Sequence, residues 1–234
     1  MAVSSLPSSY GIGCFSKEAY RFLEFCKKSG HKSWQMLPLG PTGYGDSPYQ
    51  TFSSFAFSPY YIDLEELIDL GLLTKEECNQ CDFGNGEKVD YGKLYLYRFP
   101  LLKKAHSRFI NEEHDEYERF LEEQKLWLKD YALFMAIKDD HNGDSWISWE
   151  KELRERNPIA MKTMVEKFKN EIDFYCFMQY FCRKQWENVH RYAQELELKL
   201  IGDIPIYIAL DSADAWTNPE LFQFGDGFIP IAVA

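Results

Sequence analysis

Apolar residues recur at helical spacing in the segment 17–29, which predicts an amphipathic helix. Positions i, i+3, i+4 and i+7 of its apolar face are occupied by Ala19, Phe22, Leu23 and Cys26. Ser16 precedes the segment as a suitable N-cap, and Gly30 follows it as a residue that commonly ends a helix. The pattern therefore predicts both ends of the first helix.

Three short apolar segments predict β-strands near residues 2–5, 33–38 and 198–208. The helix predicted over 17–29 lies between the first two. A strand–helix–strand order favours parallel strands joined by a right-handed crossover. We therefore expect an α/β fold in which the first two strands are parallel. The third strand, followed by a loop that carries Asp203, has the pattern of an α/β barrel strand, and all strands of a barrel run parallel.

The middle of the chain is predicted to be mainly helical. Asp63 can cap a short helix, and Thr74 with Glu77 can form the capping box of the next one. Longer amphipathic helices are predicted over 93–111, 115–139 and 158–195. Pro100 should kink the first of these helices or mark its break, because proline cannot donate a helical hydrogen bond.

The composition is that of an ordinary globular protein, with 45% hydrophobic and 27% charged residues, which excludes a disordered or fibrous chain. The formal net charge of −11 repels nucleic acid and anionic lipid, so we predict no nucleic acid and no membrane as partners. The longest apolar runs have seven residues, whereas a membrane-spanning helix needs ~20. A neutral substrate suits this chain best.

The cysteines give no sign of a disulfide scaffold, since there are only six of them in 234 residues. The N-terminal segment also lacks a signal-peptide pattern, so we expect a cytoplasmic protein. Cys78 and Cys81 have the spacing of metal ligands, but no second pair accompanies them, and ordinary thiols are the alternative. We predict no metal site and no cofactor.

The loop predicted over residues 40–61 is the first candidate for binding. Tyr44, Ser47, Tyr49 and Gln50 crowd into it among glycines and prolines. Rigid rings beside small hydroxyl and amide groups suit sugars, because the apolar faces of a pyranose stack on rings while its hydroxyls form hydrogen bonds. The alternative is a structural loop whose rings fill the core, and composition leaves both open.

Asp203 is the second candidate, because it follows an apolar strand and a glycine. A carboxylate at that position is either a site residue at the end of a barrel strand or the cap of a loop. Asp211 and Asp214 are predicted to be turn and helix-cap residues.

Five segments, taken together, resemble the amylomaltase family of 4-α-glucanotransferases from about residue 4 to the last residue. The most specific are LPLGPTGYGDSPYQ, over 37–50, and GDIPIY, which begins at Gly202 and is followed by DSADAW. The resemblance implies a (β/α)₈ TIM barrel with a large helical insertion. It also implies a retaining transfer of α-1,4-glucan segments to an acceptor sugar, through a covalent glycosyl-enzyme.

The family's site residues carry over only where the motifs match. The resemblance implies that Tyr44, Ser47 and Tyr49 contact the glucan after the second barrel strand, and that Asp203 contacts the sugar at the cleavage site. The family's nucleophile lies in an R-x-D-H-F-R-G segment, its acid/base in A-E-D-L-G and a third essential aspartate in H-D-N. None of these strings occurs here. We therefore assign no catalytic residue and expect the chain to be an N-terminal fragment, inactive alone.

The resemblance divides the chain into three parts. Residues 1–63 would hold the first barrel strands and the substrate loop, 64–197 the mainly helical insertion, and 198–234 the third strand and its loop, truncated before the catalytic strands. The expected partners are α-1,4-glucans and maltooligosaccharides, with self-association through the open barrel edge.

Two other functions stay open. A related α-glucan-acting barrel such as an amylase is disfavoured by the loop over 37–50 and by the lack of an acidic cluster for calcium. A non-catalytic module that binds glucan or a partner protein, derived from the transferase, is the other alternative.

Overall fold

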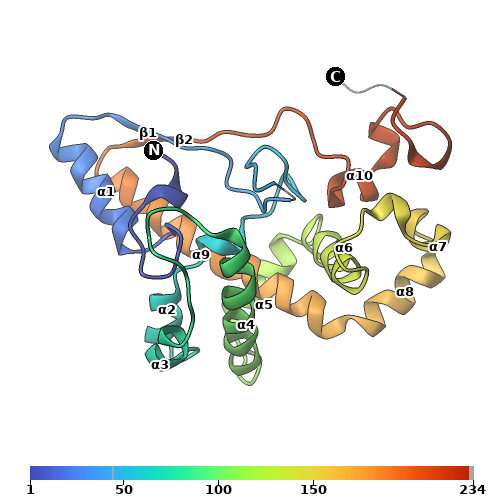
Figure 1. Cartoon of the computed structure of the whole chain (residues 1–234), viewed down its shortest axis with the longest axis horizontal. Helices are drawn as coiled ribbons and strands as arrows, with labels where there is room; N and C mark the ends of the chain where they lie inside the picture. Colours follow the sequence, from blue (N-terminus) through green and yellow to red (C-terminus); the bar gives the residue numbers. More distant parts are fainter. Residues whose placement is uncertain (44, 232–234) are drawn as a thin grey trace. The chain divides into compact units, whose positions relative to one another are not determined.

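A computed structural model describes residues 1–43 and 45–231 of the chain (Figure 1). The described residues form two compact units that alternate along the sequence. Unit 1 comprises Met1–Leu39, Phe57–Glu116 and Phe177–Ile204, and unit 2 comprises Gly40–Ala56, Tyr117–Cys176 and Pro205–Ala234. These two units are defined by contacts within the structure. The three-part division predicted from the sequence, with boundaries at residues 63 and 197, stays a prediction.

Unit 1 contains a two-stranded parallel sheet. Strand β1 (Ser33–Gln35) pairs with β2 (Lys199–Ile201), with Trp34 opposite Leu200. The parallel pairing of the second and third predicted strands is thus confirmed, although both strands are shorter than 33–38 and 198–208. Prolines explain both ends, since Pro38 and Pro205 lack the N–H that a further ladder bond needs.

The prediction of a strand near residues 2–5 is wrong. Val3–Ser5 form a short 3₁₀ helix, η1, in which Leu6 N donates to Val3 O at 3.0 Å. Met1 still lies beside β1, because the Trp34 indole donates to Met1 O at 2.7 Å. The chain therefore turns away from the sheet through local hydrogen bonds that a pattern of apolar residues does not reveal.

Helix α1 (Lys17–Lys28) covers the sheet as its spacing predicts. Ser16 Oγ accepts a hydrogen bond from Glu18 N, and Gly30 follows the helix with φ of +76°, which favours glycine. The buried face of α1 joins a core with residues of β1 and of the end of helix α9 (Lys169–Glu195), among them Leu23, Cys26, Trp34, Val189 and Ala193.

Helices α2 (Leu64–Asp69), α3 (Lys75–Asn79) and α4 (Tyr91–Phe109) complete unit 1. The predicted caps are confirmed, since Asp63 caps α2 and Thr74 forms a reciprocal capping box with Glu77. Pro100 does not break α4, which runs on through it. Its exposed position allows water to reach the helix backbone where the bond is missing.

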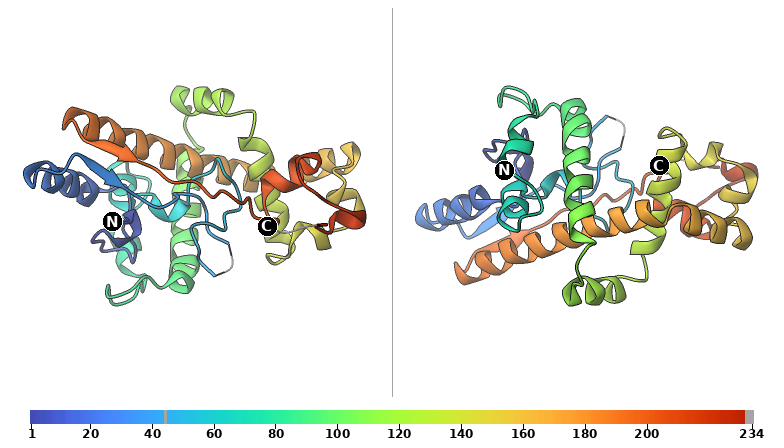
Figure 2. Two further views of the ribbon diagram at one scale, coloured as in Figure 1. Left: turned by 90° about the horizontal axis from the view of Figure 1, so that it is seen from above. Right: turned by 90° about the horizontal axis from the view of Figure 1, so that it is seen from below.

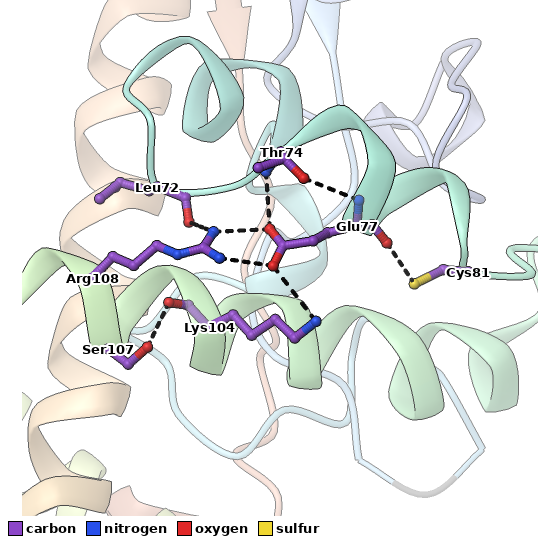
Figure 3. Close-up of polar contacts among 7 residues, drawn as sticks. All are labelled: Leu72, Thr74, Glu77, Cys81, Lys104, Ser107 and Arg108. Atoms are coloured by element: carbon purple, nitrogen blue, oxygen red, sulfur yellow. Dashed lines mark hydrogen bonds and ion pairs between the residues drawn. The ribbon is translucent and has the colours of Figure 1, made fainter.

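Glu77 also joins α3 to α4 (Figure 3). The Arg108 guanidinium donates to both Glu77 carboxylate oxygens at 2.8 Å and to Leu72 O at 2.9 Å. Lys104 Nζ lies 3.6 Å from the same carboxylate. These hydrogen bonds from Arg108 lower the pKa of Glu77 to about 2.

Helix α9 fixes the segment 57–63 through two buried glutamines. The Gln179 carboxamide accepts from Phe57 N and donates to Phe57 O, each at 2.8 Å. Gln185 does the same with Asp63 N and O, at 2.7 and 3.3 Å. Each glutamine therefore replaces the two hydrogen bonds that a neighbouring strand would supply.

Arg98 is the buried cation of unit 1. It lies on α4, which crosses α9 in Figure 2, and its side chain has no exposed surface. The guanidinium donates to Tyr10 O at 3.2 Å and to Ile62 O at 2.5 Å. Burial lowers the pKa of Arg98. Two loops are thus tied to one helix.

Unit 2 is built from shorter helices: most of α5 (Asp115–Glu123), α6 (Leu128–Asp140), α7 (Lys151–Arg154), α8 (Pro158–Lys167), the start of α9 and α10 (Ala213–Thr217). Short 3₁₀ helices η3 (Trp146–Ser148), η4 (Pro219–Leu221) and η5 (Asp226–Phe228) also belong to it, whereas η2 (Pro59–Tyr61) belongs to unit 1. The single helices predicted over 115–139 and 158–195 are each two helices, because the chain breaks near Trp127 and Phe168.

The core of unit 2 is an aromatic cluster. The rings of Phe134, Trp149 and Trp216 lie 5.5–5.8 Å apart in each pair. The Trp216 indole donates to Leu153 O at 2.9 Å, which satisfies its buried N–H. Across residues 1–43 and 45–231, no helix has both the length and the apolar character needed to cross a membrane.

Candidate functional site

The loop that holds Ser47 and Tyr49 is closed by its own backbone. Thr42 and Thr51 form an isolated antiparallel bridge, and Gly43 N donates to Gln50 O at 2.9 Å. At the tip, Ser47 Oγ accepts from Tyr49 N at 3.4 Å. The predicted site residue Tyr44 lies outside the described residues.

Tyr49 lies at the surface, with 45% of its area exposed. The core-filling alternative therefore does not hold for this ring. It does hold for Phe57 at the far end of the segment, whose ring packs against Phe15 and Trp186 in unit 1. Ser47 is half-buried, beside Tyr49. The loop thus presents one ring and one hydroxyl of the predicted set, and their role in binding stays a prediction.

Thr51 anchors the base of this loop. Its buried hydroxyl donates to Ser53 O at 2.9 Å and accepts from Ser53 N at 3.3 Å. A Cβ on Gly40 would lie 2.5 Å from Thr51 Oγ1, so only glycine fits at that position. The approach of the two loop ends therefore depends on the Gly40 of the predicted sugar-binding motif.

Asp203 lies in unit 1, two residues beyond β2. Its side chain is exposed, and Oδ1 accepts from Ile204 N at 2.9 Å. The loop-cap role is thus seen, and a contact of this carboxylate with a ligand stays a prediction. Since Ser47 and Tyr49 belong to unit 2, their convergence with Asp203 at one end of a sheet stays a prediction.

Asp214 does not cap a helix, contrary to the prediction. Ser212 caps α10, with its hydroxyl accepting from Ala215 N at 3.2 Å. The Asp214 carboxylate instead accepts from Ser54 N at 2.8 Å, and burial raises the pKa of Asp214. This hydrogen bond ties α10 to the end of the substrate loop within unit 2.

Lys138 and Asp211 form a pair that sequence reasoning missed. Lys138 Nζ donates to Asp211 Oδ2 at 2.6 Å and to Asp144 O at 3.1 Å, and its side chain is only 5% exposed. Asp211 also accepts from Trp146 N at 3.3 Å. The available signal was a lysine at the end of the apolar run ALFMAIK on α6.

The two cysteines with metal-ligand spacing behave as thiols. Burial raises the pKa of Cys78 to about 11, and Cys81 Sγ donates to Glu77 O at 3.5 Å. A protonated thiol is a poor metal ligand.

Comparison with known proteins links this geometry to one family. Residues 1–228 match the family model described as 4-alpha-glucanotransferase. A 4-alpha-glucanotransferase of Clostridium butyricum is 44% identical over 223 residues, which cover 95% of this chain and 46% of that protein. The Thermus thermophilus 4-alpha-glucanotransferase is 43% identical over 235 residues, covering 99% and 46%.

A solved structure agrees with these sequences. The amylomaltase from Streptococcus agalactiae, in complex with acarbose, superposes with a TM-score of 0.97 at 39% identity. The match covers 100% of this chain and 48% of that one. The chain thus spans about half the length of the relatives it matches.

Proposed function

The chain belongs to the 4-alpha-glucanotransferase family, and we propose that it forms the glucan-contacting part of such an enzyme. One observation carries the proposal: the family match runs through the loop that presents Tyr49 at the surface. The enzyme would transfer segments of α-1,4-glucan to an acceptor sugar, with maltooligosaccharides as substrates. The six free thiols among the described residues suit the cytoplasm, where we place the protein.

The proposed fold of the complete enzyme is a TIM barrel. β1 and β2 would be neighbouring parallel strands of it, and the helices between them, over 64–197, an insertion. In a TIM barrel the site gathers where the strands end. Ser47 and Tyr49 follow β1, and Asp203 follows β2, which suits a shared site at that end.

Each proposed site residue has a role that its chemistry allows. The rings of Tyr44 and Tyr49 would stack on apolar sugar faces, and Ser47 would form a hydrogen bond with a sugar hydroxyl. Asp203 would accept hydrogen bonds from the sugar at the cleavage site. The nucleophile and acid/base carboxyls of a retaining double displacement would come from segments that this sequence does not contain.

A chimera tests the proposed function. The matched half of the Clostridium butyricum enzyme is replaced by this chain, and disproportionation of maltotriose is followed by chromatography of the products. We expect glucose and longer maltooligosaccharides from the chimera. A Tyr49→Ala chimera should transfer about fivefold more slowly, because a stacked ring contributes on the order of 1 kcal/mol.

The matched control is Tyr95→Ala, which removes a ring that is also exposed, but on α4. It should leave the transfer rate unchanged. A chimera that folds and binds maltotriose without transferring it would favour the non-catalytic glucan-binding module instead.

A further inference from the structure

Unit 2 contains a pocket of about 950 Å³. Its wall combines the end of the substrate loop at Phe55, the start of α6 at Trp127 and the segment around Tyr207 that precedes α10. This volume lies within the usual range for small-ligand sites, and the lining mixes rings with a few polar groups. Ser47, Tyr49 and Asp203, the predicted site residues that the structure describes, do not line it.

Two stacked rings form one side of the pocket. Phe55 and Trp127 lie 6.0 Å apart at an interplanar angle of 23°, and Phe55 is 62% exposed. The Trp127 indole donates to Gln124 Oε1 at 2.9 Å, and the ring contacts the buried Tyr131 at 6.0 Å. The platform is therefore held in place before any ligand arrives, which lowers the entropic cost of binding.

Polar side chains also line the pocket. The Asp214 carboxylate accepts hydrogen bonds, and the Tyr207 hydroxyl can both donate and accept. The Asn218 carboxamide donates to Asp214 O at 3.3 Å and to Thr217 Oγ1 at 2.8 Å, and its oxygen can accept. Asp130, the other carboxylate of the lining, is already paired with Arg156. The described residues of the lining include carboxylates but no lysine or arginine, so the pocket disfavours an anionic ligand.

These features match a neutral ligand with flat apolar faces and many hydroxyls. We propose that this pocket, lined by Phe55, Trp127 and Asp214, binds a segment of α-1,4-glucan apart from the Ser47–Tyr49 loop. The proposal rests on the proposed function for its substrate class. The pocket adjoins the loop in sequence, since Ser53, Ser54 and Phe55 lie two to four residues after its closing residue Thr51. One glucan chain would thus have a second holding point within unit 2.

The test is titration of maltoheptaose into the full 234-residue chain by isothermal calorimetry. Phe55→Ala should raise Kd about five- to tenfold, because it removes the exposed half of the ring platform. Trp127→Phe should raise Kd by a smaller factor, since a smaller ring remains. Thermal melts by circular dichroism verify that each variant folds.

Phe25→Ala is the matched control. Phe25 is 58% exposed and stacks on Phe22 at 6.2 Å and 26°, but it lies on α1 in unit 1, outside this pocket. Its Kd should stay within about twofold of the wild-type value, as expected for a surface change away from a site.

The possible outcomes distinguish a failure of the pocket proposal from a failure of the proposed function. If Tyr49→Ala weakens binding while Phe55→Ala and Trp127→Phe do not, the pocket proposal is wrong and the loop assignment stands. Absence of maltoheptaose binding by the wild-type chain also overturns the pocket, and the chimera then decides the function. A change of oligomeric state in Phe55→Ala, seen by light scattering with Kd unchanged, would instead make the pocket an interface between copies.

Discussion

Unit 1 and unit 2 differ in what they do with their apolar and polar side chains. Unit 1 holds its loops through buried polar groups, namely Arg98, Gln179 and Gln185. Its exposed large apolar residues are spread over several elements, among them Phe25 on α1, Tyr95 and Leu96 on α4 and Ile201 on β2. In unit 2, several exposed large apolar residues line one pocket, among them Leu126 (89% exposed), Ile206 (86%) and Leu221 (78%).

This difference indicates that the two units have different roles. Buried hydrogen-bonded polar groups fix one arrangement of the backbone, because any other arrangement leaves them unsatisfied. Apolar side chains that stay exposed around a pocket mark a surface that meets a ligand or another surface. Unit 1 thus fixes its loops through buried polar groups, and unit 2, which also holds the buried Lys138, carries the surface that we assign to glucan.

The largest expected effect comes from removing the buried charge of Arg98 in unit 1. Arg98→Met leaves the carbonyls of Tyr10 and Ile62 without their buried donor, and should lower the free energy of unfolding by about 3–5 kcal/mol. Urea denaturation measures the change. Arg21→Met, an exposed arginine of unit 1, should cost under about 0.5 kcal/mol. Equal losses in the two variants would contradict the role of Arg98.

The corresponding change in unit 2 is Lys138→Met. It leaves Asp211 and Asp144 O without their donor, and we expect a loss of about 2–4 kcal/mol, because the ammonium is almost fully buried. Lys129→Met removes an exposed lysine of the same helix and serves as control. Hydrogen exchange should show faster opening at α10 than at β1. Faster exchange confined to β1 would show that the pair does not act within unit 2.

Gln179→Leu tests the backbone clamp. The amide and carbonyl of Phe57 both lose their partner, so stability should fall by about 2–3 kcal/mol and exchange of the Phe57 amide should accelerate. Gln194→Leu changes an exposed glutamine of the same helix and should be nearly neutral. If the Phe57 amide stays protected from exchange in Gln179→Leu, Gln179 does not hold the backbone of Phe57 in place.

The smallest effect concerns the Glu77–Arg108 pair of Figure 3. Its hydrogen bonds lower the pKa of Glu77 to about 2, below the ordinary 4.5. A depressed carboxyl pKa stabilises the fold above about pH 5, and this stabilisation is lost as the pH falls toward 2. Glu77→Gln keeps an acceptor for the capping box but removes the charge.

Arg108 is 39% exposed, so solvent screening limits the expected loss in Glu77→Gln to about 1 kcal/mol at pH 7. The gap between wild type and variant should close between pH 5 and pH 2 in urea titrations. Glu187→Gln, from an exposed pair with Arg183 on α9, is the control without such pH dependence. A gap that stays constant with pH would contradict the role of the charge.

The starts of α1, α2 and α3 were predictable from the sequence because caps are local. Ser16, Asp63 and Thr74 each bond to a backbone N–H two or three residues away. The strands were less predictable, since β1 and β2 are separated by more than 160 residues and prolines cut both short.

The buried polar residues of unit 1 could not be predicted either, because their partners lie far away along the sequence. Gln179 contacts a residue 122 positions earlier, and Arg98 reaches a carbonyl 88 positions earlier. Nothing in the local pattern of α4 or α9 marks these side chains as buried. The candidate site residues Tyr44, Ser47, Tyr49 and Asp203 stood out by their residue types and positions as well as by the family's motifs. The ring platform at Phe55 and Trp127 appears only once the fold joins two distant segments.

The central claim is that this chain contacts glucan but does not hold the catalytic carboxylates. The most direct test incubates the purified 234-residue chain with maltotriose and follows glucose release against a buffer blank. We predict no release, because positioning residues alone cannot supply the nucleophilic and acid/base steps. Glucose release that Asp203→Ala abolishes would place a catalytic group in this chain and contradict the claim.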